Sequence, residues 1–309
     1  MAFIDKWLEV ADKKNSVLCA GIDPAEFEMC RGERGLPKGV NKRDFTLRYI
    51  ESVAGYCAAF KPNIQYWVKN YSDENSKDYL ETKNDMKTLK EITELVHSLD
   101  SVCILDAKLA DIGPTNDAGF YHHKDKGFDA VTLALYAGNM EEAINQLNAR
   151  NLGGIHMCIM SNPEYEREKN KWISVEEEKD YDSRDVVKIR GVPHVRQYIQ
   201  LAHDANKFGL DGLVIGAPSE KNHIKEEEIV KVRNYVSDKM IILLPGIGTQ
   251  GGEADVIWKY FDKNNVIVNV GRGLMFPNGS NSTPEEQATT ANQYKKMLNG
   301  LREQMRLSR

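Results

Sequence analysis

Short apolar runs alternate with longer amphipathic stretches along most of the 309-residue chain. Alternation of this kind is typical of buried parallel strands that are joined by helices. We expect eight strands, at residues 17–22, 57–62, 102–106, 130–135, 155–160, 212–215, 240–244 and 266–270. We expect the clearest intervening helices at residues 76–99, 139–148, 195–208 and 224–237. This order predicts a (β/α)8 TIM barrel, and an open doubly wound sheet is the alternative.

The remaining stretches predict a helix at each end of one barrel domain that spans residues 1–309. The N-terminal helix covers about 1–15 and the C-terminal helix about 285–305. Two insertions, 25–42 and 162–193, follow the first and fifth predicted strands. The C-terminal ends of barrel strands carry the active-site loops, so these insertions could form a rim or a lid. Solvated surface loops are the simpler interpretation for most of their residues.

Composition narrows the class of protein. Hydrophobic residues make up 41% of the chain and charged residues 28%. No apolar run of about 18 residues predicts a membrane span, and the first residues lack the pattern of a secretory signal. A net charge of −5 without a basic stripe argues against a nucleic acid partner. We therefore expect a cytoplasmic protein that binds a small molecule.

The cysteines and histidines form no pattern typical of a disulfide framework or a zinc site. All five cysteines are scattered, and all except Cys30 lie in or beside apolar runs. We interpret them as reduced thiols of a cytosolic protein. Among the seven histidines, His122 and His123 are adjacent, so they cannot face one ligand from a helix. We expect the histidines at the surface and predict no metal site.

Three charged residues crowd the end of the third predicted strand. Asp106 and Lys108 come just after the apolar run 102–105, and alternate positions of a strand share a face. Asp111 follows in the tight connection to the next helix. Charged groups in a confined place must compensate each other, and such groups in a cleft are more often functional than decorative. A surface ion pair is the alternative for Asp106 and Lys108 taken alone.

Lys61 favours the functional interpretation of this cluster. It follows an apolar run at the C-terminal end of the second predicted strand, beside the third strand. A lone lysine at such a position usually extends its ammonium group into solvent. Next to Asp106, it instead completes an array of alternating charges that consists of Lys61, Asp106, Lys108 and Asp111.

Glycine-rich turns follow the seventh and eighth predicted strands. The first is the segment 245–250, and the second contains Gly271 and Arg272. Glycines let backbone N–H groups approach an anion closely, and barrels often bind phosphate at this place. Arg272 adds a planar, permanently charged set of donors. One such turn is most often only a turn, but two on successive strands predict a phosphate site.

These segments resemble one enzyme family. The motif D-x-K-x-x-D-I-x-x-T, which begins at Asp106, is similar to the central motif of orotidine 5'-monophosphate decarboxylases. Phe-Lys-Pro-Asn at 60–63 resembles the second strand of that family, and Cys-Ala-Gly-Ile-Asp-Pro at 19–24 resembles its opening strand. Matching segments occur from residue 17 to about 276, and the chain length resembles the longer subfamilies.

The resemblance implies an enzyme that converts orotidine 5'-monophosphate to uridine 5'-monophosphate in pyrimidine biosynthesis, without a cofactor or a metal ion. Loss of carbon dioxide from C6 leaves a carbanion with no conventional electron sink, so the site must stabilise that charge. Lys108 would stabilise the carbanion and then protonate C6. Asp106 would lie beside the departing carboxylate. Lys61 and Asp111 would orient these two residues and contact the ribose.

The resemblance also implies how the substrate is held. Asp23 matches a position that contacts the ribose, and Ser161 matches one that reads the edge of the pyrimidine ring. From local sequence alone, a simple Ser-Asn-Pro turn accounts for Ser161 equally well. The remaining substrate-binding residues, at the phosphate end of the site, are expected to be Pro245, Gln250, Gly271 and Arg272.

Two further points follow from the resemblance. In the family, the residues that match Asp111 and Thr115 reach into the site of a partner subunit, which implies a homodimer with shared active sites. Many longer members have an asparagine where this chain has Ala134, and this departure puts one polar contact near the ligand in doubt.

Two other functions remain open. Magnesium-dependent enzymes of the same superfamily, such as 3-keto-gulonate 6-phosphate decarboxylase, share the Asp-x-Lys-x-x-Asp spacing but have a carboxylate at the end of the second strand. Lys61 argues against this group. The other alternative is a phosphate-binding protein that has lost catalysis, and the intact set of charges argues against it.

Overall fold

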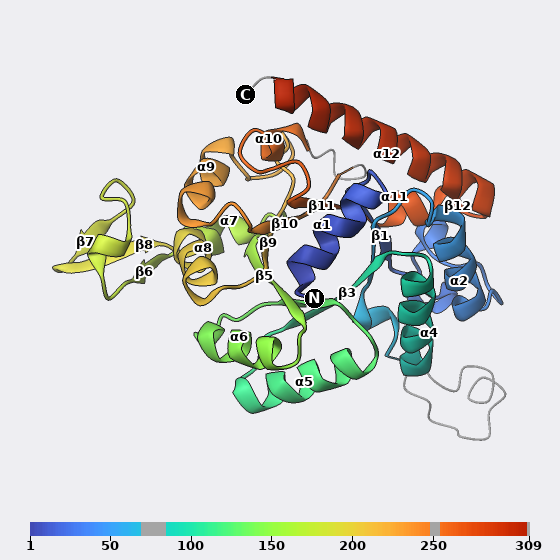
Figure 1. The fold of residues 1–309 in the computed structure, drawn as a ribbon, viewed down its shortest axis with the longest axis horizontal. Coiled ribbons are helices and arrows are strands. Elements are labelled where there is room, and N and C mark those ends of the chain that lie inside the picture. Colours follow the sequence, from blue (N-terminus) through green and yellow to red (C-terminus); the bar gives the residue numbers. More distant parts are fainter. Residues whose placement is uncertain (69–84, 248–253, 308–309) are drawn as a thin grey trace.

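The computed structural model describes residues 1–68, 85–247 and 254–307. Eight parallel strands close into a barrel in the order β1-β11-β10-β9-β5-β4-β3-β2 (Figure 1). They are β1 (Leu18–Ile22), β2 (Ala59–Pro62), β3 (Val102–Leu109), β4 (Ala130–Leu133), β5 (Gly153–Ile159), β9 (Gly212–Ile215), β10 (Ile241–Pro245) and β11 (Val266–Val270). The predicted (β/α)8 barrel is therefore confirmed.

The barrel strands are apolar because both of their faces are buried, one in the barrel interior and the other beneath the helices. Every residue of β1 and of β5 is buried. All eight predicted strands are present, and those at 212–215 and 266–270 have the predicted bounds. β3 continues past Asp106 to Leu109, which places two of the predicted catalytic charges within a strand.

Helices follow most of the strands and surround the barrel. They are α2 (Lys42–Val53), α4 (Asp85–Ser98), α5 (Gly113–Asp125), α6 (Met140–Ala149), α8 (Gln197–Phe208), α9 (Glu226–Tyr235), α10 (Asp255–Trp258) and α11 (Arg272–Met275). The four predicted helices between strands are present, although residues 76–84 of the first lie outside the described residues. The predicted terminal helices are α1 (Phe3–Lys13) and α12 (Pro284–Leu307), and α12 packs against α2 (Figure 1).

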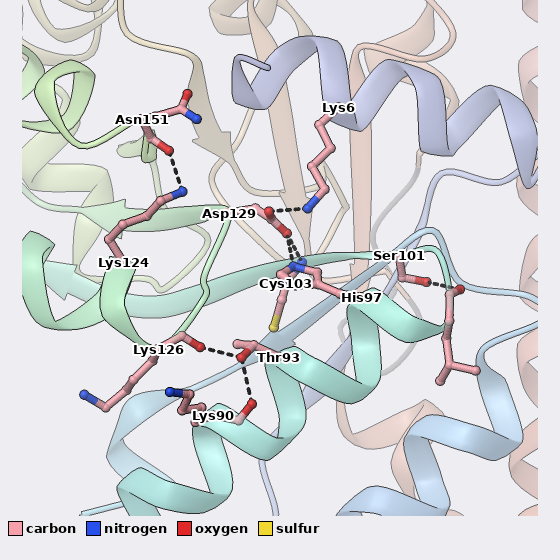
Figure 2. A network of polar contacts seen from close by, with 11 residues as sticks. Lys6, Lys90, Thr93, His97, Ser101, Cys103, Lys124, Lys126, Asp129 and Asn151 are labelled. Atoms are coloured by element: carbon pink, nitrogen blue, oxygen red, sulfur yellow. Dashed lines mark hydrogen bonds and ion pairs between the residues drawn. The ribbon is translucent and has the colours of Figure 1, made fainter.

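A polar network fixes α1 across the N-terminal end of the barrel (Figure 2). Its centre is Asp129, which precedes β4 and forms an ion pair with Lys6 of α1. Asp129 also accepts a hydrogen bond from the backbone N–H of Cys103 at 2.9 Å and lies 2.9 Å from Nε2 of His97. One carboxylate thus joins α1 and α4 to two adjacent strands, at the end of the barrel opposite the predicted site.

The insertion after β5 contains α7 (Tyr165–Lys169) and most of a three-stranded antiparallel sheet. Its strands are β6 (Trp172–Ser174), β7 (Val187–Ile189) and β8 (Val192–Arg196), with β8 in the middle. This sheet lies beside α8, outside the ring of helices, rather than over the strand ends (Figure 1). The predicted helix start at 195 is wrong, because Val195 and Arg196 pair with β6 and α8 begins at Gln197.

The other insertion, at 25–42, is mostly irregular. It contains two short 3-10 turns, η1 (Phe27–Met29) and η2 (Gly32–Arg34). The second turn contacts β12 (Pro277–Ser280), a short strand just before α12. This insertion therefore packs against the C-terminal part of the chain.

The burial of the cysteines agrees with the sequence, but that of two histidines does not. All five cysteines are unpaired, and all except Cys30 are buried. The prediction of surface histidines is wrong for His123 and His156, which are 6% and 0% exposed. Burial lowers the pKa of each to about 4, so both are neutral at pH 7. Nε2 of His156 accepts the backbone N–H of Leu135 at 2.8 Å, which satisfies this polar atom inside the fold.

Among the described residues, no helix combines the length and the apolar character needed to cross a bilayer.

Candidate active site

The ends of β2 and β3 bring three of the predicted charges into contact. Nζ of Lys61 lies 2.5 Å from Oδ2 of Asp106, and Lys61 is only 6% exposed. Nζ of Lys108 forms a second ion pair with the other oxygen, Oδ1, of the same carboxylate. The Lys108 side chain is 47% exposed, so its ammonium group faces open space at the mouth of the barrel. One largely buried carboxylate thus contacts two ammonium groups, that of the buried Lys61 and that of the half-exposed Lys108.

Lys108 reaches Asp106 because the β3 strand is irregular at this point. The ladder between β3 and β4 shifts register between Leu105 and Leu109, and Lys108 has a φ of +49°. A positive φ is uncommon for a residue with a side chain and is found mainly where the surroundings enforce it. The two side chains therefore meet as expected, but through a bulge rather than through the regular alternation of a strand.

Lys61 and Asp106 keep their charges over a wide pH range. Burial alone would raise the pKa of Asp106, but the ammonium groups of Lys61 and Lys108 outweigh burial and hold that pKa well below its usual range. Burial lowers the pKa of Lys61, but the carboxylates of Asp106 and Asp23 outweigh it, so the net shift of the Lys61 pKa is upward. At neutral pH the site therefore contains a fixed carboxylate between two cations.

Asp23 lies next to this array, at the end of β1. Burial raises its pKa, and the attraction of the Lys61 ammonium group only partly offsets this effect. Its Oδ1 atom is buried and accepts no hydrogen bond from the described residues. Its other oxygen lies 3.6 Å from the point where a Cβ atom on Gly271 would stand, so Asp23 also adjoins the predicted phosphate end. An unpaired buried carboxylate oxygen is suited to accept a hydroxyl group of a ligand.

Asp111 and Thr115 lie apart from the three joined charges. Both residues are exposed, and the Asp111 carboxylate accepts the backbone N–H of Ile112 at 2.7 Å. Asn116 and Asn139 hold the backbone carbonyl of Asp111. Among the described residues, no hydrogen bond or ion pair joins Asp111 to Lys61, Asp106 or Lys108. Within one chain the predicted four-charge array is therefore a cluster of three, and Asp111 is exposed outside it.

The predicted phosphate end lies on the neighbouring side of the barrel. β10 and β11 are adjacent to each other, and β11 is adjacent to β1, so their ends lie beside Asp23. Pro245 ends β10 and is followed by Gly246 with a φ of +98°, a conformation that favours glycine. Arg272 is exposed and begins α11 directly after Gly271. Gln250 lies outside the described residues.

Ser161 lies on the other side of the mouth, after β5. A Cβ atom on Gly216, after the adjacent strand β9, would lie only 2.9 Å from Cβ of Ser161. A side chain at position 216 would therefore clash with Ser161, and glycine avoids this clash. Ser161 and the phosphate end thus come from different arcs of the barrel, with the charged cluster on β2 and β3.

No group of three or more histidine, cysteine or acidic side chains that could hold a metal ion occurs in the described ranges 1–68, 85–247 and 254–307. Asp106 and the neighbouring Asp23 both interact with the Lys61 ammonium group, which competes with any cation. The chemistry that this cluster offers is electrostatic stabilisation and proton transfer.

Residues 16–279 match the model of the Orotidine 5'-phosphate decarboxylase / HUMPS family. The chain belongs to this family. Two similar relatives bear the name orotidine 5'-phosphate decarboxylase. The protein of Variovorax paradoxus is 27% identical, and the alignment covers 92% of this chain and 93% of the relative. The protein of Halorubrum lacusprofundi is 26% identical, and the alignment covers 98% of this chain and 100% of the relative.

Solved structures of two family members share the fold. The OMP decarboxylase of Leishmania donovani superposes with a TM-score of 0.68 at 21% identity, over 98% of this chain and 99% of the other. The orotidine 5'-monophosphate decarboxylase of Plasmodium berghei has a TM-score of 0.69 at 16% identity, over 98% and 99%. At such low identity the likeness establishes the barrel and does not by itself assign the roles of residues.

Two polar residues of the site were not predicted from the sequence. Thr132 on β4 and Asn269 on β11 are single polar residues within otherwise apolar strands. Thr132 is 1% exposed and forms a hydrogen bond with Asp106. Asn269 pairs with Pro245 of β10, and its buried Oδ1 atom accepts no hydrogen bond from the described residues. The available signal was a lone polar residue near the C-terminal end of a buried strand.

Proposed function

We propose that this chain converts orotidine 5'-monophosphate to uridine 5'-monophosphate and carbon dioxide. The observation that carries the proposal is the contact of Lys61 with Asp106, 2.5 Å apart on adjacent strands. The family name covers two groups, and the magnesium-dependent enzymes of this superfamily need a carboxylate where Lys61 stands. An ammonium group at this position repels a metal ion and supports the metal-free reaction.

In the proposed reaction, the bond between C6 and the carboxylate carbon breaks and its electron pair stays on C6. The ammonium group of Lys108, at the open side of the cluster, stabilises this charge and donates a proton to C6. Lys108 then regains a proton from solvent. A cation that is already in place does not have to reorganise during the reaction, which makes its contribution large in a site closed to water.

Asp106 holds Lys108 and keeps its own charge, because two ammonium groups depress its pKa. We propose that the substrate carboxylate lies beside this carboxylate, so that repulsion between the two is relieved when carbon dioxide leaves. The same contact fixes Lys61, which neutralises part of the buried negative charge.

In the proposed binding mode, the ribose, the phosphate and the pyrimidine each contact residues at the ends of different barrel strands. The buried, unpaired oxygens of Asp23 and Asn269 would accept ribose hydroxyl groups. The phosphate would bind at the segment from Pro245 to Gln250 and at Gly271 and Arg272, and Ser161 would contact the pyrimidine. Phosphate lies far from C6 in the substrate, so its binding energy can align the reacting group.

We also propose a cytoplasmic homodimer with shared sites. Asp111 and Thr115 are exposed, and so are the neighbouring apolar side chains of Ile112 (62%) and Tyr121 (56%). Large exposed apolar groups beside exposed polar residues support a protein interface. A partner placed there would receive Asp111 next to its own Lys108.

The test is the release of carbon dioxide from orotidine 5'-monophosphate by the purified protein, with a chelator and with added Mg²⁺. We expect equal rates in both conditions. Replacement of Lys61 by methionine should remove most of the turnover, whereas replacement of Lys171, a surface lysine paired with Glu168, should not. A requirement for Mg²⁺ would favour the magnesium-dependent group, and binding without turnover would favour a non-catalytic phosphate-binding protein.

A further inference from the structure

We propose that Thr132 is a positioning residue that sets the conformation of Lys108. Its Oγ1 atom accepts the backbone N–H groups of Ala107 at 3.1 Å and Lys108 at 3.0 Å, and donates to Oδ1 of Asp106 at 3.1 Å. A hydroxyl group has one donor and two acceptor positions, so these three bonds use its full capacity. All three partners belong to the motif that carries the proposed chemistry.

The bulge in β3 explains why a side chain is needed at this place. In the ladder with β4, Leu105 pairs with Val131, but the next pair joins Leu109 to Leu133. Four steps along β3 therefore correspond to two steps along β4, and the residues between them leave the regular pattern of the ladder. Thr132 is the β4 residue at this gap, and its hydroxyl oxygen takes the place of a backbone carbonyl for two N–H groups.

The same hydroxyl group fixes both ends of the Asp106–Lys108 ion pair. It holds the backbone of Lys108, which has the unfavourable φ of +49°, and it orients the carboxylate oxygen that the Lys108 ammonium group contacts. Without it, the backbone N–H groups of Ala107 and Lys108 lose their acceptor, and the backbone gains by returning toward a regular strand. That change would move the Lys108 ammonium group away from the position of C6.

Thr132 itself does not face the mouth. It is 1% exposed and its hydroxyl group is occupied by the protein, so it acts through Lys108 and Asp106 and leaves substrate binding to other residues. The effect of its loss should therefore appear in kcat and not in KM. Misplacement of a catalytic group by about 1 Å typically lowers the rate about 100-fold.

The test compares Thr132→Val, which keeps the shape and removes the hydroxyl group, with Thr132→Ser, which keeps the hydroxyl group. This test rests on the proposed decarboxylation. We expect the valine variant to lose about 100-fold in kcat, with KM and the affinity for uridine 5'-monophosphate within about threefold of wild type, and the serine variant to keep most of the activity.

Thr93→Val is a matched control. Thr93 is also 1% exposed, and its hydroxyl group also bonds to backbone atoms, the carbonyls of Lys90 and Lys126, but at the far end of the barrel (Figure 2). This variant should lose stability without a change in kcat. Equal loss of kcat in both valine variants, wild-type kcat in Thr132→Val, or a serine variant as slow as the valine variant would each overturn the proposal.

A crystal structure of Thr132→Val separates this proposal from the proposed function. We expect Lys108 to leave the left-handed conformation and its contact with Asp106 to lengthen. An unchanged Lys108 would refute the positioning role even if the wild-type protein proved inactive on orotidine 5'-monophosphate. A displaced Lys108 in a protein that releases no carbon dioxide would retain the positioning role and refute only the reaction.

Discussion

The replacement Asp106→Asn tests whether this carboxylate is the electrostatic centre of the site. The variant keeps the shape of the side chain and an oxygen for the Thr132 hydroxyl group, but it removes the negative charge between Lys61 and Lys108. Lys61 is 6% exposed and would then be a buried cation without its principal partner. Lys108 has a side chain that is 47% exposed, so solvent can replace most of its interaction.

The expected loss of stability comes mainly from Lys61. Removal of one partner of a buried ion pair typically costs about 3–5 kcal/mol, and the exposed pair with Lys108 adds at most about 1 kcal/mol. Asp23 remains near Lys61 and offsets part of the cost. We therefore expect the free energy of unfolding to fall by about 3 kcal/mol at pH 7.

The pH dependence of the free energy of unfolding provides a second, independent test of this prediction. In the wild type the pKa of Lys61 is raised, so its stabilising effect is complete below the unfolded value of about 10.4 and is lost only above the folded value. In Asp106→Asn, we expect burial to outweigh the remaining attraction of Asp23 and to lower the pKa of Lys61 below its unfolded value, so the native state sheds its proton first and stability rises with pH in that window. The pKa of Asp106 is lowered in the folded state, so its own contribution to stability is complete above the unfolded pKa of about 3.9 and is constant above pH 5. The gap between the two proteins should narrow from pH 7 to pH 9.5.

Urea unfolding followed by tryptophan fluorescence measures both effects, since Trp7, Trp67 and Trp258 are buried. The double variant Lys61→Met with Asp106→Asn should recover part of the stability while remaining inactive, because the buried Lys61 cation is gone, although Asp23 loses its attraction to Lys61. A single variant within about 0.5 kcal/mol of wild type at pH 7, or a gap that widens toward pH 9.5, would refute this reasoning.

Two other predictions follow from the site. Burial raises the pKa of Asp23, so its ionised form destabilises the ligand-free protein at neutral pH. Asp23→Asn should therefore raise the midpoint of thermal unfolding, measured by calorimetry, while increasing KM. A lower midpoint would contradict the pKa shift. If sites are shared in a homodimer, Asp111→Ala and Lys108→Ala should each be inactive alone. An equal mixture of the two variants should regain about a quarter of wild-type activity after subunit exchange, because half of the dimers are then mixed and each mixed dimer has one intact site of two. No recovery in a mixture shown to exchange subunits would exclude shared sites.

Much of the fold could be predicted because the barrel strands are buried on both faces. Runs such as 212–215 and 266–270 are apolar without interruption, and their bounds were predicted correctly. The strand at 192–196 was missed because its partner β6 lies about 20 residues earlier, and the exposed pairing in this small sheet leaves no apolar run. His156 was misplaced for a related reason: its acceptor role depends on Leu135, on the loop after a neighbouring strand.

The candidate site was predicted where the spacing of residues along one or two strands determines it. Lys61 and Asp106 lie at the ends of adjacent strands, so their contact follows from the order of the barrel. The bulge that turns Lys108 back onto Asp106 depends on the Thr132 hydroxyl group on the next strand, and no pattern within β3 reveals it. The separation of Asp111 from the other three charges also arises after the strand, in the loop before α5.

The central claim is that Lys108 stabilises and protonates the carbanion without a metal ion. The most direct measurement is single-turnover decarboxylation of orotidine 5'-monophosphate by the wild type and by Lys108→Ala in the presence of a chelator, with the affinity for uridine 5'-monophosphate determined for both. The proposed mechanism predicts a rate at least about 1,000-fold lower in the variant, with product affinity nearly unchanged. Wild-type turnover by Lys108→Ala, or a wild-type enzyme that the chelator silences, would contradict it.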